Sequence, residues 1–208
     1  MSFDTIIKGG TIVTASETYK ADIAIKGGKI AAIGLDLPAD GAKIVDAKGM
    51  TVVPGGIDVH THLDMPFMGA TTADDFVTGT TAAACGGTTS IIDFAIQQKG
   101  QTLRQAYDIW QKKASGKSAI DFGFHMICTD LPDERVKEMD RMVDEGVTSF
   151  KLFMAYPGIF MLDDASIFRA MLRTKENGGT ICMHAENGGV IEVLVKKALA
   201  EGKLEPKY

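Results

Sequence analysis

Pro54-Gly-Gly-Ile-Asp-Val-His-Thr-His62 is the stretch from which the fold of this 208-residue chain can be worked out. It continues an apolar run at residues 51–53, which predicts a buried strand that Gly55-Gly56 interrupts or opens to a close backbone neighbour. Side chains two apart on a strand point the same way, so Asp58, His60 and His62 are expected to share one face. Two imidazoles on one rigid strand can bind one metal ion, although a bare His-x-His also occurs at exposed strand ends.

The composition is that of a soluble globular protein, with 45% hydrophobic and 24% charged residues. The net charge is −5 and no cluster of Lys and Arg is present, so we do not expect a nucleic-acid partner. No apolar run approaches the ~20 residues of a membrane span, and residues 1–5 lack the pattern of a secretory signal. Membrane association is therefore not expected.

The three cysteines, Cys85, Cys128 and Cys182, are odd in number and widely spaced among apolar or small residues. This pattern fits buried thiols in a reducing compartment and shows no zinc-finger spacing. We therefore expect a cytoplasmic protein.

The first 53 residues contain short strand-like runs separated by turns, several of them marked by glycine. Such closely spaced strands predict a small antiparallel sheet or a sandwich. We expect residues 1–53 to form one domain.

From residue 51 onward, strand-like and helix-like segments alternate, with about 30 residues in each repeat. Expected strands after the first are residues 88–94, 120–128, 149–155 and 180–184. Expected helices are residues 73–85, 103–115, 133–145, 163–177 and 191–202. This alternation predicts a parallel sheet with right-handed crossovers, either doubly wound or a (β/α)8 barrel.

Polar residues at the carboxyl ends of the first, fourth and fifth strands favour the barrel, because barrel enzymes place their chemistry there. No Gly-x-Gly-x-x-Gly follows the first strand, which argues against a dinucleotide site. Residues 54–208 supply about five of the eight units, so we expect them to be the first part of a barrel in a longer protein.

Lys151 lies inside the apolar strand Phe150-Lys-Leu-Phe153, where a charged ammonium is costly. Burial favours the neutral amine, and a neutral amine beside metal ions can take up carbon dioxide to form a carbamate. In an average strand, a lysine more often extends to solvent or pairs with an acid.

Two further histidines follow in the chain. His184 ends the fifth strand, at the same predicted edge as His60, His62 and Lys151. A lone histidine there is more often a hydrogen-bonded surface residue than a ligand. His125 lies in the middle of the third strand, and we interpret it as structural.

Tyr156 follows the lysine strand directly, where a phenol can donate to a carbonyl oxygen that becomes an oxyanion. The alternative is a tyrosine that packs in a turn. Four apolar residues near these motifs are candidates for a substrate pocket, although their spacing fits a protein core equally well. They are Met65, Phe67, Phe153 and Phe160.

Two segments carry a family resemblance that runs through essentially the whole chain. The run from Pro54 to Asp64 resembles the first metal-binding strand of the amidohydrolase superfamily, and Phe150-Lys-Leu-Phe-Met-Ala-Tyr156 resembles a hydantoinase segment whose lysine is carboxylated. The chain is similar to the hydantoinase and dihydropyrimidinase family within that superfamily. The resemblance implies a (β/α)8 barrel preceded by part of a small β-sandwich.

The resemblance also implies the site. His60 and His62 would bind one of two divalent metal ions, zinc ahead of manganese, carboxylated Lys151 would bridge them, and His184 would bind the second. Tyr156 would stabilise the oxyanion. A further histidine and an aspartate, which the family takes from later strands, have no counterpart in this sequence.

The implied activity is metal-dependent hydrolysis of the cyclic amide bond of hydantoins and dihydropyrimidines to N-carbamoyl amino acids, by a homotetramer or dimer. Allantoinase and dihydroorotase share the His-x-His strand and stay open as alternatives. So does a non-catalytic assembly protein of the collapsin-response-mediator type. That class lacks the full set of metal ligands, whereas His60, His62, Lys151 and His184 are all present here.

Overall fold

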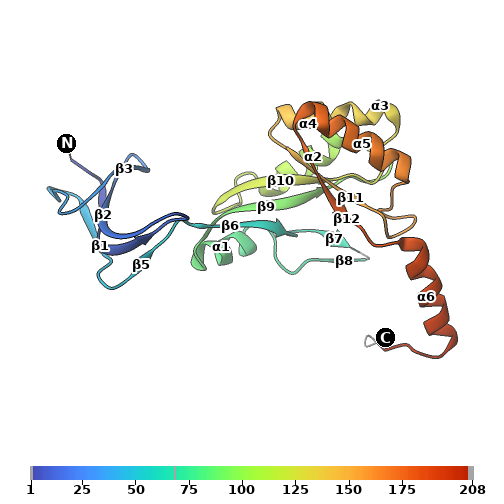
Figure 1. Cartoon of the computed structure of the whole chain (residues 1–208), viewed down its shortest axis with the longest axis horizontal. Coiled ribbons are helices and arrows are strands. Elements are labelled where there is room, and N and C mark those ends of the chain that lie inside the picture. The colour runs from blue at the N-terminus through green and yellow to red at the C-terminus, as the bar shows by residue number, and fades with distance from the viewer. Residues whose placement is uncertain (1, 68, 206–208) are drawn as a thin grey trace. The chain divides into compact units, whose positions relative to one another are not determined.

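The computed structural model describes residues 2–67 and 69–205. Residue contacts divide the chain into two units, residues 1–55 and 56–208 (Figure 1). The domain boundary expected after residue 53 stays a prediction, because contacts alone do not show that each unit folds independently.

The first unit is a five-stranded sheet. Its strands are β1 (Thr5–Val13), β2 (Thr18–Lys26), β3 (Lys29–Gly34), β4 (Lys43–Asp46) and β5 (Thr51–Val52). The order is β3-β2-β1-β4, and β5 also pairs with β1. Pairings among β1, β2 and β3 are antiparallel, but β4 and β5 run parallel to β1. The sheet is therefore mixed and not purely antiparallel.

Glycine and aspartate fix the turns of this sheet. Gly27 and Gly28 both have positive φ, 58° and 73°, as a two-residue turn between β2 and β3 requires. The carboxylate of Asp22 is buried and accepts hydrogen bonds from the N–H groups of Gly9 (2.8 Å) and Leu37 (3.2 Å). The first of these bonds lies at the irregularity in the pairing of β1 with β2.

Ile12, Ala21 and Ile23 form the small core of the first unit. Several other apolar side chains of the sheet are exposed, among them Ile30, Ile33, Ile44 and Val45. A sheet with this much uncovered apolar surface is one part of a small β-sandwich, as expected.

The second unit is built on five parallel strands. They are β6 (Gly56–Thr61), β9 (Thr88–Ile96), β10 (Asp121–Ile127), β11 (Ser149–Phe153) and β12 (Thr180–His184). Each strand pairs in parallel with the next one along the chain, so that the sheet order is β12-β11-β10-β9-β6. A doubly wound sheet would reverse this order at a switch point. The second unit is therefore part of a (β/α) barrel, and the prediction of that fold is confirmed.

Helices follow the strands. They are α1 (Thr78–Cys85), α2 (Leu103–Ala114), α3 (Asp133–Val136), α4 (Glu138–Asp144), α5 (Asp164–Asn177) and α6 (Gly188–Ala200). Helices α2 to α5 gather on one face of the sheet, and α6 extends away from them (Figure 1). A short hairpin, β7 (Pro66–Phe67) and β8 (Ala70–Thr71), lies between β6 and α1. None of the helices, within the residues that the structure describes, is long and apolar enough to cross a membrane.

Local sequence explains why α2 forms. Thr102 caps it in a reciprocal capping box with Gln105, and Leu103, Ala106 and Trp110 turn one face into the core. The core between helices and strands includes Phe124, Met126, Met139, Phe150 and Leu152.

Two helices differ from expectation. The segment expected as one helix at residues 133–145 forms α3 and α4, which meet at Lys137. The helix expected from residue 73 begins at Thr78, because Asp75 lies in the preceding turn. There its carboxylate accepts the N–H groups of Val77 and Thr78.

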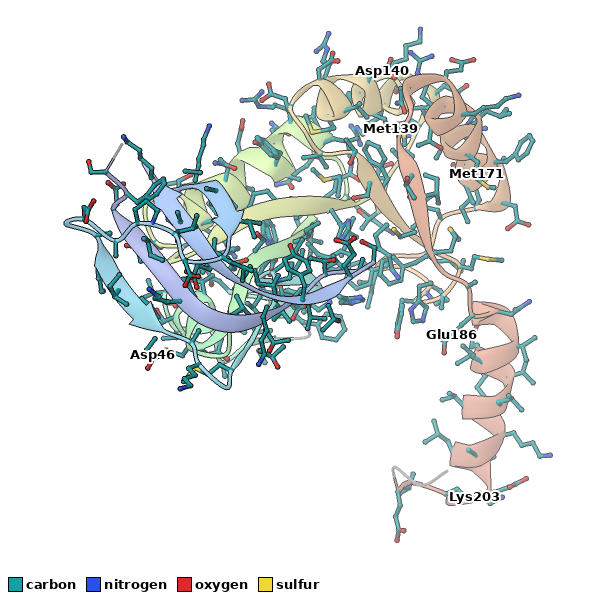
Figure 2. The ribbon with its side chains drawn as sticks, turned by 60° about the vertical axis from the view of Figure 1, so that its left-hand side comes forward. Asp46, Met139, Asp140, Met171, Glu186 and Lys203 are labelled. Atoms are coloured by element: carbon teal, nitrogen blue, oxygen red, sulfur yellow. The ribbon has the colours of Figure 1, made fainter. Side chains whose placement is uncertain are left out.

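Asp140 of α4 anchors α5. Its carboxylate accepts from both Nε (2.8 Å) and Nη2 of Arg173 and from Nδ2 of Asn177 (3.0 Å). The pKa of Asp140 is lowered from its ordinary value, and the largest cause is the bidentate hydrogen bond from Arg173. Figure 2 labels Asp140 and Met139 on α4 and Met171 on α5.

Replacing Asp140 by Asn should lower the melting temperature by about 1–3 °C at pH 7, as for a partly exposed ion pair. Because the folded-state pKa is depressed, the carboxylate stabilises the fold above the ordinary value of 3.8, and this contribution is lost as the pH falls below it. Thermal melts between pH 7 and 3 measure the difference between wild type and Asp140→Asn. Asp144→Asn on the same helix is the control, and a gap that does not depend on pH would contradict the assignment.

Candidate metal centre and its surroundings

His60 and His62 lie together at the carboxyl end of β6. Their ring centroids are 5.2 Å apart, and both rings contact the ring of Phe94, at 4.7 and 4.8 Å. The expected shared face is therefore seen for the two histidines. Asp58 turns its carboxylate to its own strand, where Oδ1 accepts the N–H of His60 (3.1 Å).

The ring of His62 has one nitrogen that makes no hydrogen bond within the described residues. Its Nδ1 is buried and has no hydrogen-bond partner in the described part of the chain. Burial, first, and the nearby charges of His60 and Lys151 lower the pKa of His62. A neutral imidazole with a free nitrogen is the form that binds a metal.

Lys151 lies on β11 between the fully buried Phe150 and Leu152. Its Nζ stands 5.2 Å from the ring centroid of Phe153. Its charge acts on His62 across the strands between them. Within residues 2–67 and 69–205 its ammonium makes no ion pair or hydrogen bond, so the pairing with an acid that is usual for a strand lysine is not seen.

His184 ends β12 and stacks on Phe153, with 5.3 Å between ring centroids. Its Nε2 lies 2.5 Å from the Glu186 carboxylate, and Figure 2 places Glu186 where the chain leaves β12 for α6. Tyr156 lies beside the same imidazole, again with 5.3 Å between centroids. The structure thus brings His184 and Tyr156 together around Phe153.

The backbone of Tyr156 is strained. Its φ is 62°, in the left-handed region that a bulky residue rarely adopts, and its carbonyl accepts the N–H groups of Ile159, Phe160 and Met161. The side chain is 38% exposed. Strain of this kind persists where the surrounding structure enforces it, often at a functional site.

Three of the four expected pocket residues form an aromatic group. Phe160 stacks on Phe153 at 5.0 Å and on Phe67 at 6.1 Å. Phe67 and Phe160 line a cavity of about 380 Å³, together with residues 97–99 and Thr129 at the ends of β9 and β10. Met65 packs against the hydrophobic core and does not line this cavity.

Two residues near the site were not identified as functional from the sequence. Asp93 on β9 is fully buried, and its carboxylate accepts hydrogen bonds from the residues on either side of His62. Burial raises the pKa of Asp93, and hydrogen bonds from Leu63 and Thr61 oppose that rise. His125 contacts Phe94 with 4.8 Å between centroids. A charged residue inside an apolar strand was the available signal for Asp93, as for Lys151.

Imidazole nitrogens suit a divalent metal ion, and His60 and His62 offer two rings side by side. No group of three His, Cys, Asp or Glu side chains that could hold a metal occurs among the described residues. The two imidazoles lie side by side and Nδ1 of His62 has no hydrogen-bond partner in that part of the chain, so a third donor would have to come from another kind of group. The imidazole of His184 lies on β12, where its Nε2 contacts the Glu186 carboxylate.

Known proteins are similar to this chain in sequence and in structure. A model of the amidohydrolase family matches residues 51–207. The chain is 54% identical to the D-hydantoinase of Streptomyces coelicolor, covering 100% of this chain and 46% of that protein. It is 43% identical to the rat dihydropyrimidinase over 97% of this chain and 40% of that protein. The crystal structure of dihydropyrimidinase from Brevibacillus agri superposes with a TM-score of 0.94 at 51% identity. The match covers 97% of this chain and 44% of that one. The chain spans less than half the length of these relatives.

Proposed function

Because this chain belongs to the amidohydrolase family, we propose that the protein hydrolyses the ring amide of hydantoins or dihydropyrimidines to N-carbamoyl amino acids. The observation that carries the proposal is the pair His60 and His62 at the carboxyl end of β6, with Lys151 of the same parallel sheet near enough for its charge to act on His62. The relatives named above are hydantoinases and dihydropyrimidinases, which favours their substrates over those of allantoinase or dihydroorotase.

We propose that His60, His62, His184 and carboxylated Lys151 hold two divalent ions, zinc or alternatively manganese. When bound, such ions act as a Lewis acid and lower the pKa of water to about 7. The neutral state of His62, favoured by burial, supports its role as a ligand.

The chemistry of Lys151 follows from its surroundings. A neutral amine forms an N–C bond to carbon dioxide and releases one proton, which leaves an anionic carbamate. Within the described residues the Lys151 amine makes no ion pair or hydrogen bond and contacts the ring of Phe153, so no carboxylate has to be displaced before this reaction. The carbamate then turns a cation that repels metal ions into a ligand.

In the reaction, a water oxygen bonds to the ring carbonyl carbon and the ring C–N bond breaks. The nitrogen takes up the proton that the water gives up. Negative charge develops on the carbonyl oxygen, and the phenol of Tyr156 would donate to it. The enforced backbone of Tyr156 supports this role, because a fixed donor needs no reorganisation during the reaction.

The ring substituent of the substrate would lie against the aromatic group of Phe67, Phe153 and Phe160. These rings stack on one another, and Phe153 also contacts His184. Met65 would contribute from the core side.

We also propose a cytoplasmic homo-oligomer, a dimer or tetramer. Cys85, Cys128 and Cys182 are free thiols, which suits a reducing compartment, although only Cys128 is buried as expected and Cys85 is exposed. Phe168, Met171 and Leu172 of α5 are exposed apolar side chains that an interface between copies would cover. Light scattering on the full-length protein tests the assembly.

Lys151→Ala should abolish bound metal and activity, because the bridging carboxylate is lost. Short carboxylic acids should restore part of both. Elemental analysis of the purified full-length variant and a hydantoin and dihydrouracil assay measure these effects. Lys26→Ala, which removes an exposed strand lysine in the first unit, is the control. Full metal content in Lys151→Ala would refute the bridging role.

Tyr156→Phe should reduce kcat by ~10²–10³-fold with unchanged metal content, as when one oxyanion donor is removed. Tyr107→Phe removes a phenol that packs on α2 against Phe124 and should have no such effect. Near-normal turnover in Tyr156→Phe would leave that side chain a packing role only.

A further inference from the structure

The strand that carries His60 and His62 contains a β-bulge. From Asp58 to Thr61, β6 advances three residues, while its partner β9 advances only two, from Ile91 to Asp93. Val59 and His60 therefore lie where the ladder is interrupted, and their backbone groups need other partners.

Side chains supply those partners. The N–H of His60 donates to Oδ1 of Asp58 (3.1 Å), and the carbonyl of Val59 lies 2.9 Å from Nε2 of His125 on β10. A carbonyl can only accept, so Nε2 carries the proton and Nδ1 accepts from the hydroxyl of Ser149 on β11 (2.5 Å). One imidazole thus links the bulge to β10 and β11.

The other side of the bulge is held by Asp93. Its Oδ2 accepts both the hydroxyl of Thr61 and the N–H of Leu63, each at 2.8 Å, and its Oδ1 accepts its neighbour Phe94 (2.8 Å). With its carboxylate fully buried and given three donors, Asp93 is fixed in one orientation.

These contacts alternate with the two histidines along the chain. Val59, Thr61 and Leu63 are each anchored, and His60 and His62 lie between them. Register matters here because a slip of one residue turns each side chain to the opposite face of a strand. With the bulge held, both imidazoles face Phe94.

We propose that Asp93 and His125 are positioning residues that hold the β6 bulge and so set the placement of the metal-binding pair His60 and His62. The inference rests on the proposed function, which makes these two histidines ligands. It assigns to Asp93 and His125 a role through backbone and hydroxyl contacts, without contact to the metal or substrate.

The test removes single hydrogen bonds, since Asp93→Asn would leave a buried amide facing three donors and could unfold the protein. Thr61→Val has the same shape and loses the hydroxyl that Asp93 accepts, whereas Thr61→Ser keeps it. Thr89→Val is the matched control, because it removes a hydroxyl bond to Gly56 at the opposite end of the same strand pair.

Full-length wild type and variants are loaded with Co²⁺, and the visible ligand-field spectrum and the affinity, by competition with a chelator, are recorded. We expect Thr61→Val to shift the spectrum and weaken binding by roughly 10–100-fold, the range for partners of metal ligands. Thr61→Ser and Thr89→Val should behave as wild type. Melting of the metal-free proteins checks that all of them fold.

A second pair tests the other anchor. His125→Gln keeps an N–H donor toward Val59, and His125→Met lacks it, so only His125→Met should change the spectrum. Wild-type spectra and affinities in both Thr61→Val and His125→Met would overturn the positioning role while leaving the proposed function intact. Failure of the wild type to bind metal would overturn the proposed function and this inference with it.

Discussion

The parallel pairing of five strands in chain order is the constraint on which this structure depends. Because all five strands run parallel, every strand ends on the same side of the sheet. His60 of β6 and His184 of β12 are far apart in sequence, yet this rule brings both to one end of the sheet, while Lys151 lies in the middle of β11.

Two phenylalanines organise the polar side chains at that end. The ring of Phe94 contacts His60, His62 and His125, and the ring of Phe153 contacts His184, Tyr156 and Phe160. Phe94 and Phe153 are both buried, so their rings form a rigid apolar surface under these side chains. Packing against this rigid surface restricts the rotamers of the imidazoles, and in this way a site keeps its geometry before a ligand binds.

The sequence predicted the five parallel strands, most helices and the grouping of His60 with His62, because these depend on local periodicity, but the expected burial of the first strand was wrong, since Ile57 and Val59 of β6 are exposed. It did not predict the β6 bulge, because the extra residue is defined only by the partner strand β9. The partners of Asp93 and His125 were missed for the same reason: Thr61, Leu63 and Val59 are more than 25 positions away from them. Nor could periodicity show that the helix expected at residues 133–145 is interrupted at Lys137, between α3 and α4.

Asp93 and Lys151 are two ionisable residues whose surroundings differ. Both lie inside apolar strands, where an unpaired charge is costly. Asp93 is satisfied by three donors within the protein, which fixes it in place and leaves it nothing further to bind. Among the described residues, Lys151 makes no hydrogen bond or ion pair and contacts only the ring of Phe153, and the Nδ1 of His62, whose pKa that charge helps to lower, has no hydrogen-bond partner. The unsatisfied groups are therefore the ones with capacity to bind a ligand, and the satisfied carboxylate is the one that holds their strand in register.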